Sequence, residues 1–155
     1  YNRQMNTYIL MLSKTFPKGH LHAGEQTFFK EKLGISKLHT IRANYPLWEQ
    51  RIAEIQAGKG VLSIRQWVDE PYRSKQVEIA QLTANEGVGI QKLIFIDNNI
   101  MLPVIEYGSG NEFKSMDRYM FAKNDGLSFK DWKAWFRNYD LSNPLAIIHF
   151  TNFRY

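Results

Sequence analysis

The sequence predicts an α+β fold in which a small, mostly antiparallel β-barrel has about three helices packed at its ends. About six short β-prone segments occupy the middle and both ends of the chain, and most are joined by short turns. Strands and helices do not alternate as in βαβ units, so a doubly wound parallel sheet is not expected. The 155 residues fit a single domain, which we assign to residues 1–155.

The first third of the chain predicts one strand and two helices. Residues 7–13 are apolar and β-prone, which indicates a buried strand. Residues 24–33 have a helical pattern that Gly34 can end. Residues 47–57 predict an amphipathic helix, because apolar side chains recur at positions i, i+4 and i+7: Trp48, Ile52 and Ile55.

Four strands follow in two pairs. Residues 61–67 alternate between two faces, and residues 76–82 form a second strand after a turn-rich segment. Residues 92–97 and 100–106 predict a hairpin across Asn98-Asn99, because asparagine tolerates the positive φ that such a turn needs.

The C-terminal part predicts one more helix and a central strand. Ser128 can cap a helix whose apolar stripe consists of Phe129, Trp132 and Phe136. Residues 145–150 form a nearly continuous apolar run, which is typical of a strand buried on both faces.

Composition restricts the classes of function. The net charge of +5 and the pI near 9.4 are compatible with a polyanionic partner such as RNA. The absence of cysteine excludes disulfides, thiolate catalysis and cysteine-based zinc sites. No apolar run approaches 18 residues, so no membrane span is expected. We expect a cytoplasmic protein, because a chain without cysteine suits a reducing compartment.

The stretch from Ser36 to Arg42 is the strongest candidate for a functional site. Lys37, Thr40 and Arg42 lie between the end of a predicted helix and a β-prone segment, where side chains often converge on a ligand. Thr40 and Arg42 share one face of a strand. A bend at Gly34 and Ser36 would bring the side chain of Lys37 to the same side as those of Thr40 and Arg42, so that all three could meet in one cleft.

This stretch allows two interpretations. Thr40 can act as a nucleophile with Lys37 as its base. That role requires burial and the neighbouring Arg42 to lower the pKa of Lys37 by roughly three units from about 10.4. Alternatively, Thr40 only begins a strand and the two cations are solvated.

A second polar cluster precedes the helix that Ser128 caps. Asn124 and Asp125 stand just before the helix N-terminus, where backbone N–H groups favour polar ligand groups. Asp125 could orient Lys37 or bond the edge of a base, although a nearby carboxylate raises the pKa of a lysine. The alternative is that Asn124-Asp125-Gly126 is only a turn.

Two further groups are weaker candidates. Arg65 and Trp67 share a strand face, and a ring beside a cation suits a single-stranded nucleic acid; a core tryptophan beside a solvated turn is the alternative. His20, His22 and Glu25 lie close enough in sequence to hold a metal, but a polar loop explains them more simply. We therefore expect no metal and no cofactor.

The string Lys37-x-x-Thr40-Ile41-Arg42 resembles the signature of ASCH domains, a branch of the PUA-like superfamily. Residues 58–64 resemble the glycine and first barrel strand that follow this signature, and residues 147–150 resemble the last strand of the family. The resemblance spans most of the chain. It implies a small PUA-like β-barrel with a cleft for RNA or a nucleoside.

The resemblance also implies a chemistry. Some small ASCH proteins are amidohydrolases that remove an acyl group from N4-acylcytidine with a Lys and a Thr of this motif and a downstream acid. Lys37 and Thr40 match the first two directly. Asp125 stands where those enzymes carry Glu, which is one methylene longer, and this chain is longer than those compact enzymes.

We therefore expect a domain that binds RNA or a modified nucleoside in a cleft lined by Lys37, Thr40, Arg42 and Asp125. An amide hydrolase acting on an acylated nucleobase is the alternative. A protein-interaction module that uses exposed aromatic side chains is a third possibility. The sequence leaves the oligomeric state open.

Overall fold

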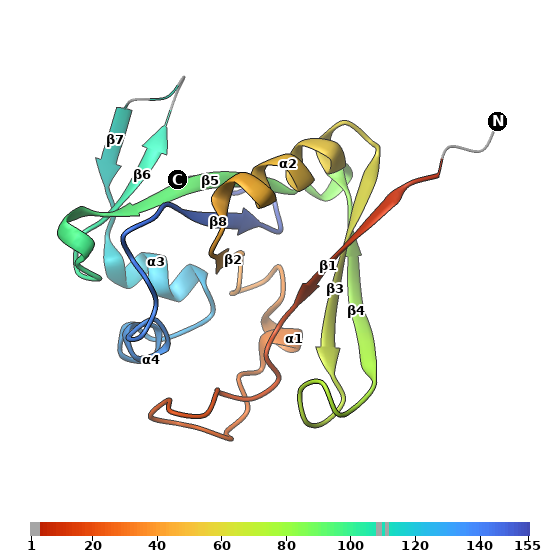
Figure 1. Ribbon diagram of the computed structural model, residues 1–155, viewed down its shortest axis with the longest axis horizontal. Helices are drawn as coiled ribbons and strands as arrows, with labels where there is room; N and C mark the ends of the chain where they lie inside the picture. The colour runs from red at the N-terminus through yellow and green to blue at the C-terminus, as the bar shows by residue number, and fades with distance from the viewer. Residues whose placement is uncertain (1–3, 108–109, 111) are drawn as a thin grey trace.

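The computed structural model describes residues 4–107, 110 and 112–155. In these residues the chain forms eight β-strands in two sheets and four α-helices (Figure 1). The predicted α+β class is therefore confirmed. Among the described residues the sheets have three and five strands, and no strand pairing joins one sheet to the other.

The three-stranded sheet has the order β1-β3-β4 and consists of β1 (Asn6–Met11), β3 (Gly60–Trp67) and β4 (Gln76–Leu82). The central strand β3 pairs in parallel with β1 and antiparallel with β4. The strand predicted at residues 7–13 is present as β1, but the prediction that it is buried is wrong. In this edge strand only Leu10 is fully buried, because only one face of the strand packs on the core.

The five-stranded sheet has the order β2-β8-β5-β6-β7, and all its neighbours are antiparallel. Its strands are β2 (His39–Arg42), β5 (Gly89–Phe95), β6 (Pro103–Tyr107), β7 (Glu112–Ser115) and β8 (Leu145–His149). All residues of β8 are buried between β2 and β5, which confirms the predicted central strand.

The helices are α1 (Phe29–Lys32), α2 (Tyr45–Gln56), α3 (Arg118–Asn124) and α4 (Phe129–Trp135). α2 contacts β3 of one sheet and β5 and β8 of the other, so it bridges the two sheets (Figure 1). Ser128 caps α4 as predicted, because its Oγ accepts a hydrogen bond from a backbone N–H of the first turn. No helix in the described ranges combines the length and the apolar composition needed to cross a membrane.

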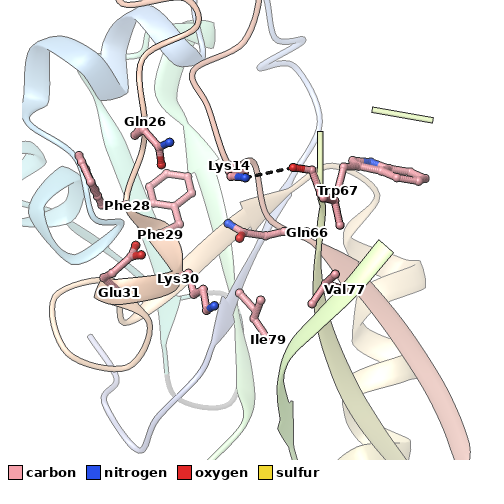
Figure 2. A pocket seen from close by; sticks show the side chains of 11 residues that line it. Lys14, Gln26, Phe28, Phe29, Lys30, Glu31, Gln66, Trp67, Val77 and Ile79 are labelled. Carbon is pink, nitrogen blue, oxygen red and sulfur yellow. Dashed lines mark hydrogen bonds between the residues drawn. The ribbon is translucent and has the colours of Figure 1, made fainter. Parts of the chain in front are cut away.

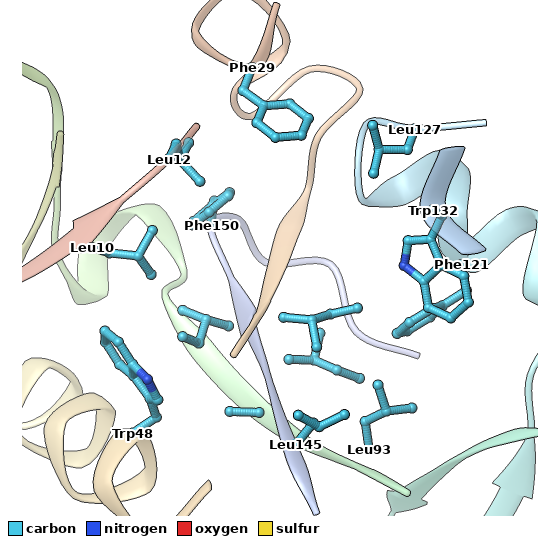
Figure 3. Packing of buried hydrophobic residues seen from close by; sticks show 14 of the residues in the cluster. Leu10, Leu12, Phe29, Trp48, Leu93, Phe121, Leu127, Trp132, Leu145 and Phe150 are labelled. Atoms are coloured by element: carbon cyan, nitrogen blue, oxygen red, sulfur yellow. The ribbon is translucent and has the colours of Figure 1, made fainter. Parts of the chain in front are cut away.

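One hydrophobic core joins both sheets and the helices (Figure 3). Leu10 of β1 and Trp48 of α2 belong to the same cluster as Leu145 of β8. At its other end, Phe121 of α3 and Trp132 of α4 pack edge to face with ring centroids 5.6 Å apart. Complete burial of side chains of this size stabilises the fold by about 1.5–3 kcal/mol each.

The helix predicted at residues 24–33 is much shorter than expected, because only α1 is helical. Phe28, just before it, has left-handed backbone angles with φ of 59°. Thr27 Oγ1 donates to the carbonyl oxygens of Ser13 and Lys14 at 2.7 and 3.1 Å. These contacts hold the segment against the chain that follows β1 and outweigh its weak helical preference.

β5 and β6 form the predicted antiparallel pair, but the two-residue turn at Asn98-Asn99 is wrong. The connection is longer, and its ends are joined by a hydrogen bond from Ile96 N to Leu102 O at 3.1 Å. Asp97 and Asn98 carry the positive φ values, 54° and 56°. The sequence analysis also missed the exposed strand β7 and the helix α3, because neither has a clear apolar period.

Candidate functional site

Lys37, Thr40, Arg42 and Asp125 line one cavity of about 210 Å³, which we call the Lys37 hollow. The chain that follows β1 closes one side of it, and α1, β2 and the two C-terminal helices supply the other walls. Aromatic side chains form much of the remaining surface: Phe29, Trp135, Phe136 and Tyr139.

A tight turn ahead of β2 directs Lys37 into this hollow. Gly34 has φ of 76°, and the carbonyl oxygen of Lys32 accepts hydrogen bonds from three successive backbone N–H groups, those of Ile35, Ser36 and Lys37. The bend predicted at Gly34 and Ser36 is therefore present. It brings Lys37 beside Asp125, with which it forms an isolated β-bridge.

The amine of Lys37 is buried against a carboxylate and an aromatic ring. Only 2% of the residue is exposed. Its Nζ donates to Oδ1 of Asp125 at 2.9 Å and to the backbone carbonyl of Asp125 at 2.7 Å. It also lies 4.1 Å from the ring centroid of Phe29, a cation–π distance. Burial lowers the pKa of Lys37; Asp125 opposes this shift, and Arg42 adds to it.

Asp125 supplies the negative charge that balances Lys37. It is the residue that caps the C-terminal end of α3, as well as a residue of the turn before α4. Its backbone N–H donates to the carbonyl oxygens of Phe121 and Ala122, which holds the residue in place. Burial by itself raises the pKa of the Asp125 carboxyl. The nearby Lys37 and His39 outweigh burial, so the net shift is downward and the carboxylate is charged near neutral pH.

Thr40 and Arg42 form a second pair on β2. Arg42 Nη1 donates to Thr40 Oγ1 at 2.8 Å, and Nη2 donates to the carbonyl oxygen of Met11 at 2.5 Å. Burial lowers the pKa of Arg42, but a guanidinium stays protonated. Within the described part of the chain, no hydrogen bond joins Thr40 Oγ1 to Lys37 Nζ, and the hydroxyl proton of Thr40 has no acceptor. That proton is available to a ligand.

The other three predicted ligand-binding residues do not line the Lys37 hollow. Asn124 Nδ2 donates to the hydroxyl of Tyr155 at 3.2 Å, and neither residue lines the hollow. Arg65 Nε donates to Ser63 Oγ at 2.9 Å, within the three-stranded sheet. Trp67 lines two other cavities. The structure therefore separates these residues from the four that meet at the hollow.

The sequence analysis missed a buried contact behind Asp125. His39 places Nδ1 3.6 Å from Asp125 Oδ1 and Nε2 2.5 Å from the hydroxyl of Tyr155. It also missed the aromatic walls, of which Phe29 and Tyr139 are examples. No local pattern marks these residues, because segments far apart in the sequence bring them together.

His20, His22 and Glu25 form a polar loop that is tied to α4. His22 Nδ1 lies 2.6 Å from a Glu25 carboxylate oxygen, and its Nε2 lies 3.2 Å from Oδ1 of Asp131. His20 Nε2 lies 2.9 Å from the backbone carbonyl of Asp131. In the ranges that the structure covers, no group of three or more His, Cys, Asp or Glu side chains is placed to hold a metal ion.

Gly126 packs directly against the stem of Lys37. Its φ is 82°, and a Cβ at this position would lie 3.0 Å from Cβ of Lys37. Its carbonyl oxygen also accepts a hydrogen bond from Lys32 Nζ at 2.9 Å. The backbone at this position is therefore the wall that fixes the course of the Lys37 side chain.

The lowered pKa of Lys37 predicts how stability depends on alkaline pH. Because its pKa is lowered, Lys37 loses its proton at a lower pH in the folded state than in the unfolded chain, where the ordinary pKa is 10.5. Just below pH 10.5 the unfolded state thus binds more protons than the folded state. The free energy of unfolding therefore increases there as the pH rises. In urea titrations from neutral pH to 10.5, we expect the stability of the wild type relative to Lys37→Met to increase. A constant difference would show that Lys37 stays fully charged throughout this window.

Comparisons with known proteins identify no relative of this chain. A scan against protein-family models, a search of curated proteins and a search of solved structures each found no match to the chain.

Proposed function

We propose that this chain is an ASCH domain of the PUA-like superfamily, and that the Lys37 hollow binds the base of RNA or of a modified nucleoside. The observation that carries the proposal is the buried Lys37–Asp125 ion pair in the wall of an aromatic-lined cavity. Removing two charges from water costs several kcal/mol per ion before pairing offsets it. Buried charges with shifted pKa values that face a cavity are typical of functional sites.

The polar groups of the hollow match the edge of a base. Lys37 and Arg42 carry N–H donors, which suit a ring carbonyl. The Asp125 carboxylate can accept from an exocyclic amine, and the hydroxyl of Thr40 can donate its unused proton. A nucleobase edge presents donors and acceptors side by side, so a mixed set of this kind can hold it in one orientation.

The size and the walls of the hollow favour one base. Its volume of about 210 Å³ lies below the roughly 300–1,000 Å³ of sites for drug-sized ligands. The rings of Phe29, Trp135 and Tyr139 offer surfaces on which a planar ligand can stack. The net charge of +5 favours a ligand that carries phosphate.

We also infer that the two sheets are the halves of a PUA-like barrel. Two observations support this inference. α2 packs against strands of both sheets. Leu10 and Ile64 of the three-stranded sheet share a core with Ile147 of the five-stranded sheet.

Calorimetric titration with cytidine, N4-acetylcytidine and a single-stranded RNA oligonucleotide tests the proposal. We expect the wild type to bind at least one of them, and Arg42→Met to weaken that binding about tenfold or more, because a hydrogen bond to a charged group contributes about 1.5–3 kcal/mol. Arg73→Met is the matched control, because the side chain of Arg73 is 82% exposed and does not line the Lys37 hollow. Failure of the wild type to bind any of the three, or equal binding by Arg42→Met, would contradict the proposal.

Amide hydrolysis is the second candidate function. The observation that favours it is that Lys37, whose pKa is lowered by burial, lines the same hollow as the Thr40 hydroxyl. Thr40 Oγ1 would attack the acyl carbon of N4-acetylcytidine while Lys37 takes the hydroxyl proton. Lys37 would return that proton to the departing amine as the C–N bond breaks. Water would then hydrolyse the threonine ester, so that cytidine and acetate are the products.

A further inference from the structure

A second cavity of about 250 Å³ lies between α1 and the ends of β3 and β4 (Figure 2). We call it the Gln66 hollow. It shares Phe29 with the Lys37 hollow. One aromatic ring therefore forms part of the wall of both cavities.

The amide of Gln66 is the unusual group in this cavity. Gln66 is only 7% exposed, yet its side chain makes no hydrogen bond within the described part of the chain. Figure 2 shows the amide pointing from β3 across the hollow toward Phe29. The polar atoms of this amide are open to the hollow, so a ligand there can bond to them directly.

The walls around this amide suit a flat ligand. Phe28 is 54% exposed and lies at one side of the hollow, whereas the ring of Trp67 points away from it (Figure 2). Phe28 is also a bulky residue in the left-handed region, with φ of 59°. Strain of this kind costs about 1–3 kcal/mol and concentrates at functional sites. Val77 and Ile79 supply an apolar floor.

The rim of the cavity carries more positive than negative groups. Lys14 and Lys30 line it together with one acid, Glu31. Lys14 Nζ donates to the backbone carbonyl of Val68 at 3.0 Å, which holds this cation at the rim. A second amide, that of Gln26, also lines the hollow. Cations beside stacking surfaces suit a phosphate-linked base.

We propose that the Gln66 hollow is a second base subsite, so that the ligand is a single-stranded nucleic acid with neighbouring bases on either side of Phe29. This inference rests on the proposed function of the Lys37 hollow. The Gln66 amide hydrogen-bonds the edge of the second base, and Phe28 stacks on its face. Lys14 and Lys30 pair with the backbone phosphate. A free nucleoside fills only the first hollow.

Titration calorimetry with cytidine 5′-monophosphate and with all RNA dinucleotides that carry cytidine at either end tests this subsite. We expect at least one dinucleotide to bind the wild type about tenfold or more tightly than the mononucleotide, because stacking of one base contributes a factor of this size. Gln66→Leu and Phe28→Gly should each bring dinucleotide affinity close to that of the mononucleotide. Both should leave mononucleotide affinity unchanged.

Phe28→Gly also relieves the left-handed backbone, so it tests the subsite in a variant expected to fold. Gln50→Leu, on the exposed face of α2, is the matched control for Gln66→Leu. Dinucleotides that bind the wild type no more tightly than the mononucleotide would overturn the subsite alone. An equal loss of mononucleotide and dinucleotide binding in both variants would do the same. Absence of any nucleotide binding by the wild type would overturn the proposed function as well.

Discussion

Asp125→Ala is expected to lower the free energy of unfolding at pH 7 by about 3–5 kcal/mol, because it leaves a buried ammonium without its counter-charge. Lys37 is 2% exposed, and its Nζ would keep only the backbone carbonyl of residue 125 as an acceptor. Urea unfolding measures the loss directly. The exposed Asp69 offers a matched control, since Asp69→Ala should change stability by no more than about 0.5 kcal/mol.

A double variant separates the charge from the packing. Lys37→Met combined with Asp125→Ala removes both charges, so it should be more stable than Asp125→Ala alone. Raising the pH toward 10.5 should also reduce the cost of Asp125→Ala, since the amine then loses its proton. A double variant that is as unstable as the sum of the two single variants would show that the pair is not energetically coupled.

Thr40→Val is expected to abolish acetate release from N4-acetylcytidine if the wild type hydrolyses this compound, because valine keeps the shape of threonine but has no nucleophilic oxygen. Lys37→Met should reduce the rate by about 10²–10⁴-fold, the usual contribution of a general base. Both rates are measured as the appearance of cytidine by chromatography.

The control for this experiment is Thr7→Val, on the exposed edge of β1. It should retain the wild-type rate, and Thr40→Val should remain folded because valine is well tolerated in a strand. Hydrolysis by Thr40→Val at the wild-type rate would exclude Thr40 as the nucleophile. Absence of turnover by the wild type, together with nucleoside binding, would leave binding as the function of the hollow.

The placement of the four polar side chains could be predicted because local rules determine most of it. Alternation along β2 puts Thr40 and Arg42 on one face, and Gly34 permits the bend that turns Lys37 toward them. Their roles in binding or catalysis stay predictions. Asp125 was found as a polar group before α4, but its partner was uncertain, since the pairing joins segments far apart in the sequence.

The parts that sequence reasoning missed depend on tertiary contacts. Residues 24–28 have a helical pattern, yet hydrogen bonds from Thr27 to the chain after β1 hold them in a loop. The same loop places Phe28 at the Gln66 hollow. Gln66 itself occupies an ordinary position in a predicted strand, and only the absence of a partner in the folded chain makes it conspicuous.

Gly126 has a consequence for which substitutions this chain can accept. A larger residue there would need a left-handed backbone and would displace the methylene stem of Lys37, although it would alter no charged group. The amine would move away from its carboxylate through a purely steric displacement. A variant lineage could therefore lose the geometry of this site while every ionisable side chain around it stayed intact.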